Sequence, residues 1–222
     1  MPTYLVTGAN RGLGLEFARQ LSRRGDRVIA TARNPKDAPE LNGLDVRVEP
    51  LDVTDDASIA RLATTLAGEP IDVLINNAGV GQTTDTLADL TAMELLRVFH
   101  ANAVGPMMVA KALLPNVRAG GRRLIVSLSS VMGSIASTSS GGSYAYRASK
   151  AALNMLNRTM AIELEDVTCI VLHPGWVKTD MGGAGARLEI PESIAGMLRV
   201  IDGLSQGDDG RYLDYQGSEL PW

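Results

Sequence analysis

Thr7-Gly8-Ala9-Asn10-Arg11-Gly12-Leu13-Gly14 is the most telling stretch of this 222-residue chain. It follows a short β-rich run and opens a segment with helical periodicity, Leu13–Arg24. Glycine is needed where a strand turns sharply into a helix and where the backbone approaches a pyrophosphate closely. The free N–H groups at the start of the helix would hold the anion, although a tight turn alone also explains the glycines. We therefore predict a nucleotide site formed by Gly8, Asn10, Arg11, Gly12, Leu13 and Gly14.

Short β-rich runs alternate with helical segments along the whole chain. The expected strands are Thr3–Thr7, Arg27–Ala32, Asp45–Pro50, Asp72–Asn76, Arg123–Ser129, Thr168–His173 and Arg211–Tyr215. The expected helices are Leu13–Arg24, Ala57–Leu66, Ala92–Arg118, Tyr146–Leu164 and Pro191–Leu204. Several strands are apolar without alternation, which is typical of strands covered on both faces. We expect a single α/β domain over residues 1–222, a Rossmann-type doubly wound parallel sheet of about seven strands with helices on both faces.

Composition narrows the class of protein. Hydrophobic residues make up 45% of the chain and the formal net charge is −4, which argues against nucleic acid or an anionic membrane as the main partner. The one cysteine, Cys169, lies in an apolar run and is expected to be a buried thiol in a reducing compartment. Two histidines without clustered spacing predict no metal site, and we expect His100 and His173 to be structural. With no signal peptide and no apolar run of about 20 residues, we expect a cytoplasmic protein.

Tyr146 and Lys150 form the most informative pair of side chains. A spacing of four residues stacks them on one face of the expected helix. An ammonium beside a phenol favours the phenolate, so the tyrosine pKa should fall from about 10 toward neutral pH. A tyrosine of this kind can act as a general acid or base. The pair alone is common by chance, and it gains weight from the glycine stretch in the same chain.

The second expected strand indicates which dinucleotide would bind. A ribose without phosphate is usually held by an acidic residue at the end of this strand, where the chain has Thr31-Ala32-Arg33 instead. Arg33 could pair with a 2′-phosphate, and Arg11 could reach the same group; a solvated surface arginine is the alternative for each. The cofactor expected from these residues is NADP(H).

Two further segments follow strands and could line the adenosine. Asp52-Val53 comes after the third strand, where the carboxylate could accept from the adenine amino group or could simply cap a turn. Asn76-Asn77-Ala78-Gly79 ends the fourth strand, and its amides could both bridge strands and contact the nucleotide. From these segments the predicted contacts are Asp52, Val53, Asn77, Ala78 and Gly79.

At this point the chain resembles the short-chain dehydrogenase/reductase family along nearly its whole length. The matching pieces, in the order of the family, are Thr7–Gly14, Asp52, Asn76–Gly79, Asn102, Ser129-Ser130, Tyr146–Lys150 and Pro174-Gly175. Three stretches resemble the subgroup of C-factor and sniffer-type carbonyl reductases: residues 129–135, 144–155 and 173–183. The final residues 214–222 are similar too.

The resemblance implies a role for each matching residue. Tyr146 would protonate the substrate oxygen, and Lys150 would lower the tyrosine pKa and hydrogen-bond the nicotinamide ribose. Ser130 would hold the substrate carbonyl, and Asn102 would position a water. The turn after the sixth strand would lie at the nicotinamide amide, with contacts from Pro174, Gly175, Val177 and Thr179.

The chain departs from the family pattern near the serine. Ser130 lies 16 residues before Tyr146, whereas the common spacing is about 13, so we expect a loop insertion near residues 138–142. Ser129 is the alternative, because alternation along a strand turns only one of the two inward. Tyr144 has no lysine four residues later, since position 148 is alanine.

These residues predict an enzyme that reduces a carbonyl with NADPH. Residues 181–191 contain three glycines and would form a short substrate lid, which favours an open pocket. The alternative is a dinucleotide-binding signalling protein of the C-factor type with weak or no turnover. A serine hydrolase has no support, because no Gly-x-Ser-x-Gly stretch is present.

An oligomer is also expected, since members of this family usually pair the long helices that carry Asn102 and Tyr146. The first of these helices has a largely apolar surface, with Leu95, Leu96, Phe99, Met107, Met108, Leu113 and Leu114. Core packing explains part of this surface. We expect a homodimer or homotetramer, with a monomer as the alternative.

Overall fold

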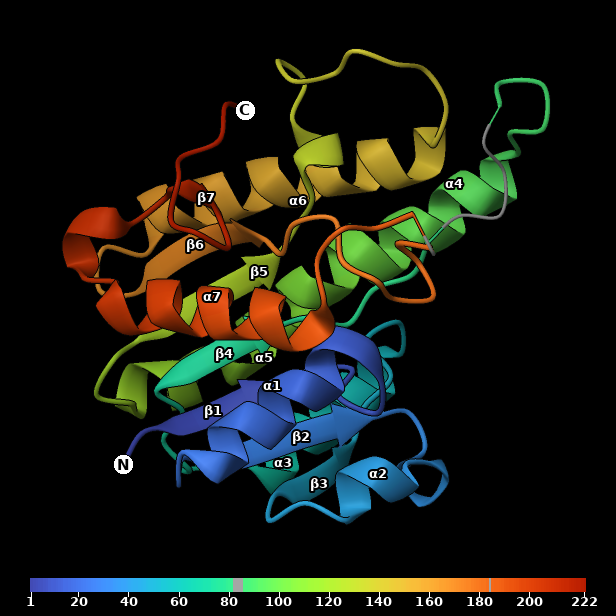
Figure 1. Ribbon diagram of the computed structural model, residues 1–222. Helices are drawn as coiled ribbons and strands as arrows, with labels where there is room; N and C mark the ends of the chain where they lie inside the picture. Colours follow the sequence, from blue (N-terminus) through green and yellow to red (C-terminus); the bar gives the residue numbers. More distant parts are fainter. Residues whose placement is uncertain (82–85, 184) are drawn as a thin grey trace.

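The computed structural model describes residues 1–81, 86–183 and 185–222. Seven parallel strands form one sheet in the order β3-β2-β1-β4-β5-β6-β7 (Figure 1). In chain order they are β1 (Thr3–Val6), β2 (Arg27–Ala32), β3 (Arg47–Pro50), β4 (Val73–Asn76), β5 (Leu124–Leu128), β6 (Thr168–His173) and β7 (Tyr212–Asp214). The predicted α/β class and the parallel Rossmann-type sheet are confirmed.

Helices cover both faces of the sheet. One face packs against α1 (Gly12–Arg23), α2 (Pro39–Asn42) and α7 (Ile190–Gly203). The other packs against α3 (Asp56–Thr65), α5 (Gly105–Ala119) and α6 (Tyr144–Glu163), while α4 (Ala92–Phe99) extends beyond the sheet (Figure 1). Short 3-10 turns occur at Pro35–Asp37, Val131–Gly133 and Gln206–Asp208. Among the described residues, no helix is both long and apolar enough to cross a bilayer.

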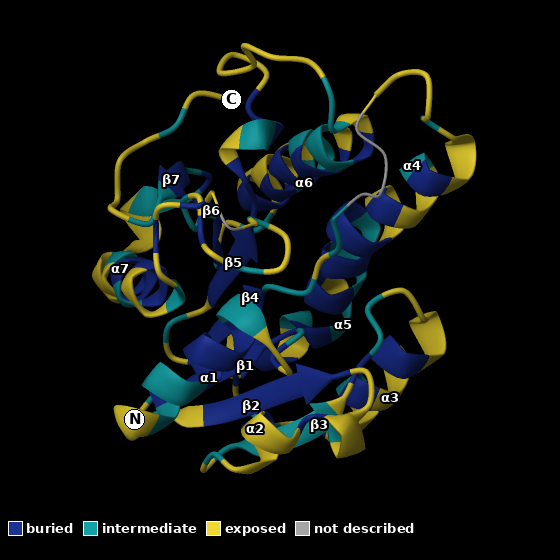
Figure 2. Ribbon diagram, turned by 45° about the vertical axis from the view of Figure 1, so that its right-hand side comes forward, coloured by how far each residue is buried: buried dark blue, intermediate teal, exposed yellow. Residues whose placement is uncertain are grey.

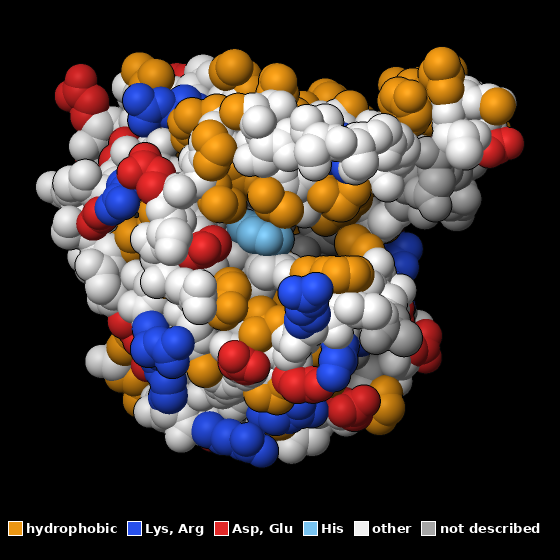
Figure 3. All heavy atoms as spheres, turned by 45° about the horizontal axis from the view of Figure 1, so that its top comes forward, with side chains coloured by type: hydrophobic (Ala, Val, Ile, Leu, Met, Phe, Trp, Pro, Cys, Tyr) orange, Lys and Arg blue, Asp and Glu red, His pale blue; other side chains and the backbone are white. Residues whose placement is uncertain are grey.

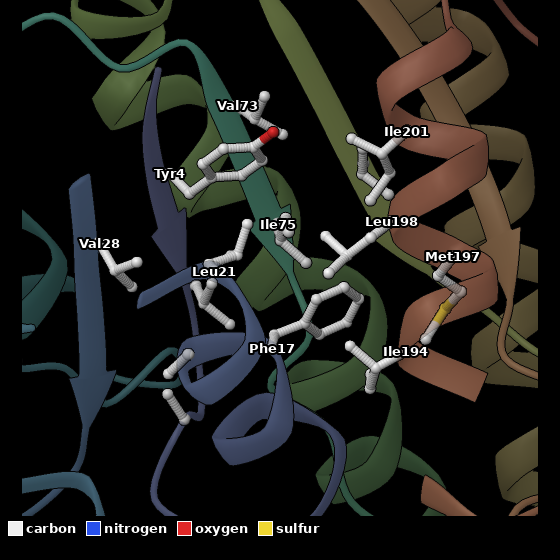
Figure 4. Packing of buried hydrophobic residues seen from close by; sticks show 14 of the residues in the cluster. Tyr4, Phe17, Leu21, Val28, Val73, Ile75, Ile194, Met197, Leu198 and Ile201 are labelled. Carbon is white, nitrogen blue, oxygen red and sulfur yellow. The ribbon is translucent and has the colours of Figure 1, made fainter. Parts of the chain in front are cut away.

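The core lies in two layers, one on each face of the sheet. Phe17 and Leu21 of α1 pack against Ile194, Leu198 and the neighbouring residues of α7, above the side chains of the central strands (Figure 4). Successive strand residues supply opposite layers, so β1, β4 and β5 are buried throughout (Figure 2). Burial on both faces explains why these strands show no alternation of apolar and polar residues.

Cys169 lies in the second layer, as predicted for a buried thiol. Burial is the main cause that raises its pKa to about 12, with further contributions from Asp209 and Asp166. The thiol therefore stays protonated at neutral pH.

One expected helical segment, Ala92–Arg118, changes its helix type midway. A π-helical turn at His100–Val104 joins α4 to α5. The wider turn places Asn102 fully inside the protein, where its amide bonds Val80 and Ser149. Local widening of this type often occurs at functional sites.

We predict that Leu113→Ala lowers the free energy of unfolding by about 2–5 kcal/mol, because the side chain is buried between α5 and the sheet and its loss leaves a cavity. Urea denaturation followed by circular dichroism measures this change. Leu87→Ala is the matched control, since Leu87 is 69% exposed and should lose little. Equal losses for the two variants would contradict the described core.

Candidate active site

The candidate site lies where the carboxyl ends of the parallel strands meet at one edge of the sheet. The loops after β1, β4, β5 and β6 all begin at this edge. The edge therefore gathers the glycine loop, Asn77–Gly79, Ser130 and the turn after His173. In open α/β sheets, ligands bind in the crevice at this edge, where the strand order reverses.

The glycine loop is shaped by close backbone packing. Gly8 and Gly12 have left-handed φ values of +65° and +57°, which favour glycine. A Cβ on Gly14 would lie 2.4 Å from the Gly8 carbonyl oxygen, whereas a Cβ on Gly12 would meet nothing within 4 Å. No side chain of the described residues caps the N-terminus of α1. The loop thus presents open space and free N–H groups, the arrangement that a pyrophosphate requires.

Asn77 joins this loop to the end of β4. Its Nδ2 donates to the carbonyl oxygens of Thr7 (2.8 Å) and Gly8 (3.1 Å). The Thr7 hydroxyl accepts from the backbone N–H groups of Asn77 and Ala78, each at 3.0 Å. The bridging role expected of these amides is present, and it holds the loop and Ala78 in fixed register.

Ser130 and Tyr146 lie together beside the loop. Ser130 is buried at the end of β5, and its side chain hydrogen-bonds Tyr146 at the start of α6. Ser129 turns the other way, and its hydroxyl donates to Asn154 Oδ1 at 2.6 Å. The structure therefore brings Ser130, rather than Ser129, to the tyrosine. Tyr144, two residues earlier, is 39% exposed.

Lys150 is buried one turn after Tyr146. Its Nζ donates to the Leu128 carbonyl oxygen at 2.8 Å and lies 5.8 Å from the centre of the Tyr146 ring. Burial lowers the pKa of this amine to about 8. The ammonium is therefore close to losing its proton in a physiological pH range.

The prediction that the Tyr146 pKa falls is wrong. Burial raises the pKa of this phenol, and the hydrogen bond with Ser130 opposes the shift only in part. The Lys150 amine donates to the Leu128 carbonyl oxygen, and burial disfavours its charged form by lowering its pKa. The site therefore holds a phenol that keeps its proton at neutral pH.

Asn102 lies next to Lys150 across Gly79. A Cβ on Gly79 would be 3.1 Å from Asn102 Oδ1 and 3.8 Å from Lys150 Nζ. Asn102 accepts from the Val80 N–H at 2.8 Å and donates to the Val80 carbonyl oxygen at 2.9 Å. It also donates to the Ser149 hydroxyl at 3.1 Å. These bonds fix Gly79 and Val80 against α6.

The two arginines predicted for a 2′-phosphate differ in placement. Arg33 is exposed after β2, and its charge contributes to the electrostatic environment of Asp52. Burial alone would raise the Asp52 pKa, but hydrogen bonds from Thr54 and the charge of Arg33 lower it. Arg11 instead pairs with Asp180 at 2.7 Å, and both side chains are largely exposed. Asp52 also accepts from the Thr54 N–H at 2.9 Å, the turn-capping role that was the alternative for this residue.

The turn after β6 is held from both sides. Ser193 Oγ donates to the Pro174 carbonyl oxygen at 2.6 Å, and Gly175 has a φ of +84°. Val177 forms a parallel bridge with Leu188, and Thr179 Oγ1 accepts from the Gly182 N–H at 3.0 Å. The expected lid, residues 181–191, continues from this turn, and residue 184 within it lies outside the described part of the chain.

One histidine ends β6, and the other begins the π-helical turn. His173 ends β6, where burial lowers its pKa to about 4 against the opposing charge of Asp214. His100 is exposed at the start of the π-helical turn.

Two parts of the site were not predicted from the sequence. The Leu128 carbonyl that receives the Lys150 amine leaves no signal in a sequence, because every residue has this group. Asn154 could have been found: it follows Lys150 by four residues, so it continues the helix face that carries Tyr146. It orients Ser129 away from the tyrosine.

Known proteins resemble this chain in sequence and in fold. A family model described as short chain dehydrogenase matches residues 2–187. The chain is 51% identical over 162 residues to C-signal of Myxococcus xanthus, which covers 72% of this chain and 98% of that protein. The NADPH-bound carbonyl reductase from chicken fatty liver superposes with a TM-score of 0.94 at 36% identity, covering 100% of this chain and 99% of the other. The carbonyl reductase Sniffer of D. melanogaster gives a TM-score of 0.95 at 33% identity, with both chains covered in full.

We predict that Lys150 makes stability depend on pH. Its pKa is about 8 in the folded protein against an ordinary value of 10.5, so between these values the unfolded chain carries one more proton. Stability contributed by this group therefore rises with pH, and wild type should gain about 1–3 kcal/mol relative to Lys150→Met between pH 8 and pH 10.

Urea titrations at four pH values from 7 to 10 measure this difference. Lys111→Met, which removes an exposed lysine from α5, is the control and should follow wild type at every pH. A constant difference between wild type and Lys150→Met across this range would show that the amine is not buried as described.

Proposed function

Because the chain belongs to the short-chain dehydrogenase family, we propose that it is an oxidoreductase that transfers a hydride from NADPH to a carbonyl carbon. The substrate would be an aldehyde, a ketone or a quinone. One observation carries the proposal: Ser130 and Tyr146 lie in hydrogen-bond contact beside buried Lys150, at the same sheet edge as the glycine loop.

The glycine loop fits a dinucleotide. The uncapped N-terminus of α1 would bind the pyrophosphate, and Gly12 leaves the space that a side chain would fill. Arg33, with Asp52 beside it, would bind the 2′-phosphate, and Asn77–Gly79 would line the adenosine side. The turn Pro174–Thr179 would hold the nicotinamide amide through Val177 and Thr179. NADPH supplies the hydride; the protein supplies binding, orientation and the proton.

Tyr146 is suited to donate that proton. Hydride delivery to a carbonyl carbon leaves a negative oxygen, which needs a donor within hydrogen-bond reach. Burial keeps the phenol protonated at neutral pH, and its bond with Ser130 orients it. Ser130 would hold the same substrate oxygen, so the two hydroxyl groups would bracket the developing charge.

Lys150 would stabilise Tyr146 after the proton has left. Its amine is 5.8 Å from the ring centre, and at pH values below its pKa of about 8 it carries a positive charge that favours the phenolate. Asn102, fixed between Val80 and Ser149, would support the lysine from the neighbouring turn. We propose that Asn102 positions a water at this point.

The region around the turn suits a substrate with an apolar body. Trp176 and Met181 are 56% and 53% exposed near the expected lid. Figure 3 shows hydrophobic side chains gathered along the upper part of one face and around a central hollow. A short lid with three glycines supports broad tolerance for carbonyl substrates.

The similarity to C-signal favours a second candidate, a dinucleotide-binding signalling protein with weak or no turnover. A sensor has no need of a tyrosine and a lysine in register beside a serine. A biological effect that survives the loss of turnover in a Tyr146 variant would favour signalling.

We also propose a homodimer or homotetramer. The outer faces of α4 and α6 expose large apolar side chains, with exposed fractions of 79% for Met93, 70% for Leu96, 67% for Met155 and 69% for Ile162. Size-exclusion chromatography with light scattering tests this proposal, and a monomer at micromolar concentration would contradict it.

The function is tested by binding and turnover together. NADPH and NADH are titrated by quenching of tryptophan fluorescence, and a panel of aldehydes, ketones and quinones is then assayed by the loss of absorbance of the reduced nicotinamide. We expect tighter binding of NADPH and turnover of several carbonyl classes. Binding without turnover of any carbonyl would favour the signalling candidate, and selective turnover of one compound would contradict the open pocket.

We predict that Tyr146→Phe lowers kcat by about 10²–10⁴-fold, because the proton donor is lost while the ring and its packing remain. The affinity for NADPH should change little. Tyr144→Phe is the matched control: its ring is partly exposed at the start of α6, and it should retain wild-type turnover. Full activity of Tyr146→Phe would refute the assignment of the proton donor.

We predict that Arg33→Ala weakens NADPH binding about 10-fold or more and leaves NADH binding unchanged, because only NADPH carries the 2′-phosphate. Lys36→Ala, which removes another exposed cation from the same loop, should have a much smaller effect. An equal loss of affinity for NADPH and NADH in Arg33→Ala would show that Arg33 does not bind the 2′-phosphate.

A further inference from the structure

We propose that the C-terminal arm, residues 215–222, positions Ser130 for the carbonyl substrate. The inference rests on the proposed reductase function and extends it to a part of the chain far from the reacting groups in sequence. Four contacts carry it: the fold-back of the arm, the stacking of Trp222, the hydrogen bond of Tyr212 and the packing of Gly133.

The arm turns back tightly after β7. The Asp214 N–H donates to the Ser218 carbonyl oxygen at 2.9 Å, and Gly217 takes a φ of +90° that favours glycine. Leu213 and Glu219 form an antiparallel bridge, and the Leu220 N–H donates to the Tyr212 carbonyl oxygen at 2.8 Å. The end of the chain is thereby directed along β7 toward the loop that follows β5 (Figure 1).

Trp222 joins that loop to β7. Its ring centre is 5.2 Å from that of Tyr212, with the planes tilted by 32°. Its backbone oxygen accepts from Ser134 Oγ at 3.0 Å and from the Ala136 N–H at 3.1 Å. Aromatic pairs at this distance are stabilising, so one residue packs on the strand and binds the loop.

Tyr212 contacts both Trp222 and Ser130. The tyrosine is fully buried, and its hydroxyl donates to the Ser130 carbonyl oxygen at 2.5 Å. Burial is the main cause that raises its pKa to about 12, so the hydroxyl remains a donor at all physiological pH values. The backbone of Ser130 is thus held by a side chain that Trp222 covers.

The other side of the loop is in close contact with α6. A Cβ on Gly133 would lie 2.8 Å from both Lys150 C and Lys150 Cβ, so the turn Val131–Gly133 packs directly on α6. Ser130 therefore sits between the helix that carries Tyr146 and the clamp formed by Tyr212 and Trp222. Since small displacements of a positioning group can lower a rate strongly, loosening one side should reduce turnover.

The test combines kinetics with hydrogen exchange. Trp222→Ala, Trp222→Phe and Tyr212→Phe are assayed with NADPH and a reducible aldehyde, and Trp222→Ala is repeated in a Ser130→Ala background. Hydrogen exchange of residues 130–138 is followed by mass spectrometry in each variant. Gln216→Ala, an exposed residue of the same arm, is the control and should match wild type.

We expect Trp222→Ala to lower kcat/KM for the aldehyde about tenfold without changing the Kd for NADPH, and Trp222→Phe to restore most of it. Residues 130–138 should exchange faster, whereas the glycine loop should not change. The effect of Trp222→Ala should disappear in the Ser130→Ala background, because the arm acts through Ser130.

Either of two results would overturn the proposal. The first is that Trp222→Ala lowers kcat/KM in the Ser130→Ala background as much as it does in wild type. The second is that hydrogen exchange of residues 130–138 is unchanged in both Trp222→Ala and Tyr212→Phe. If Trp222→Ala does not fold, Tyr212→Phe decides the matter, since it removes only one hydroxyl. If wild type itself fails to reduce carbonyls, the reductase function is lost, while the exchange data still decide whether the arm holds the loop.

Discussion

The close approach of backbone to backbone where β1 turns into α1 is the constraint on which the rest of the structure depends. Any side chain at Gly14 would collide with the Gly8 carbonyl oxygen and with Asn77 Nδ2, at 2.4 Å and 2.5 Å. Because nothing larger than hydrogen fits there, α1 begins directly against the end of β4. Asn77 closes the unit by donating to Thr7 and Gly8. The N-terminus of α1 is thereby fixed relative to the sheet edge that carries Ser130 and Tyr146.

Burial then sets the chemistry of the groups at this edge. It raises the pKa of Tyr146 and lowers that of Lys150 to about 8, so the phenol holds a proton and the amine is near its titration point. A protonated phenol suits reduction, which consumes a proton, better than oxidation, which requires a base. The two groups also differ in their partners: Tyr146 is bonded by Ser130, whereas Lys150 is held by the Leu128 carbonyl. The environment of these two side chains on one helix thus sets how each of them binds its proton.

Local patterns in the sequence predicted the sheet, five helices and the residues that the sheet edge brings together, because glycine turns, apolar strands and helical spacing act over a few residues. What local patterns could not supply depends on contacts across the fold. The π-helical turn places Asn102 in hydrogen bonds with Val80, and Arg11 is directed by its ion pair with Asp180. The Tyr146 pKa is raised by burial. The hydrogen bond from Tyr212 to Ser130 connects residues that are 82 positions apart, and no periodicity in the sequence indicates such a pair.

We propose that the protein delivers a hydride to a carbonyl carbon while Tyr146 supplies the proton. The most direct measurement follows the hydrogen itself, by incubating the protein with an aldehyde and NADPH deuterated at either C4 position of the nicotinamide. We predict that one of the two labelled coenzymes gives an alcohol with a single deuterium on its carbinol carbon, seen by mass spectrometry and NMR, and that the yield falls in step with kcat in Tyr146→Phe. An alcohol without deuterium from both coenzymes, or no alcohol at all, would contradict the account.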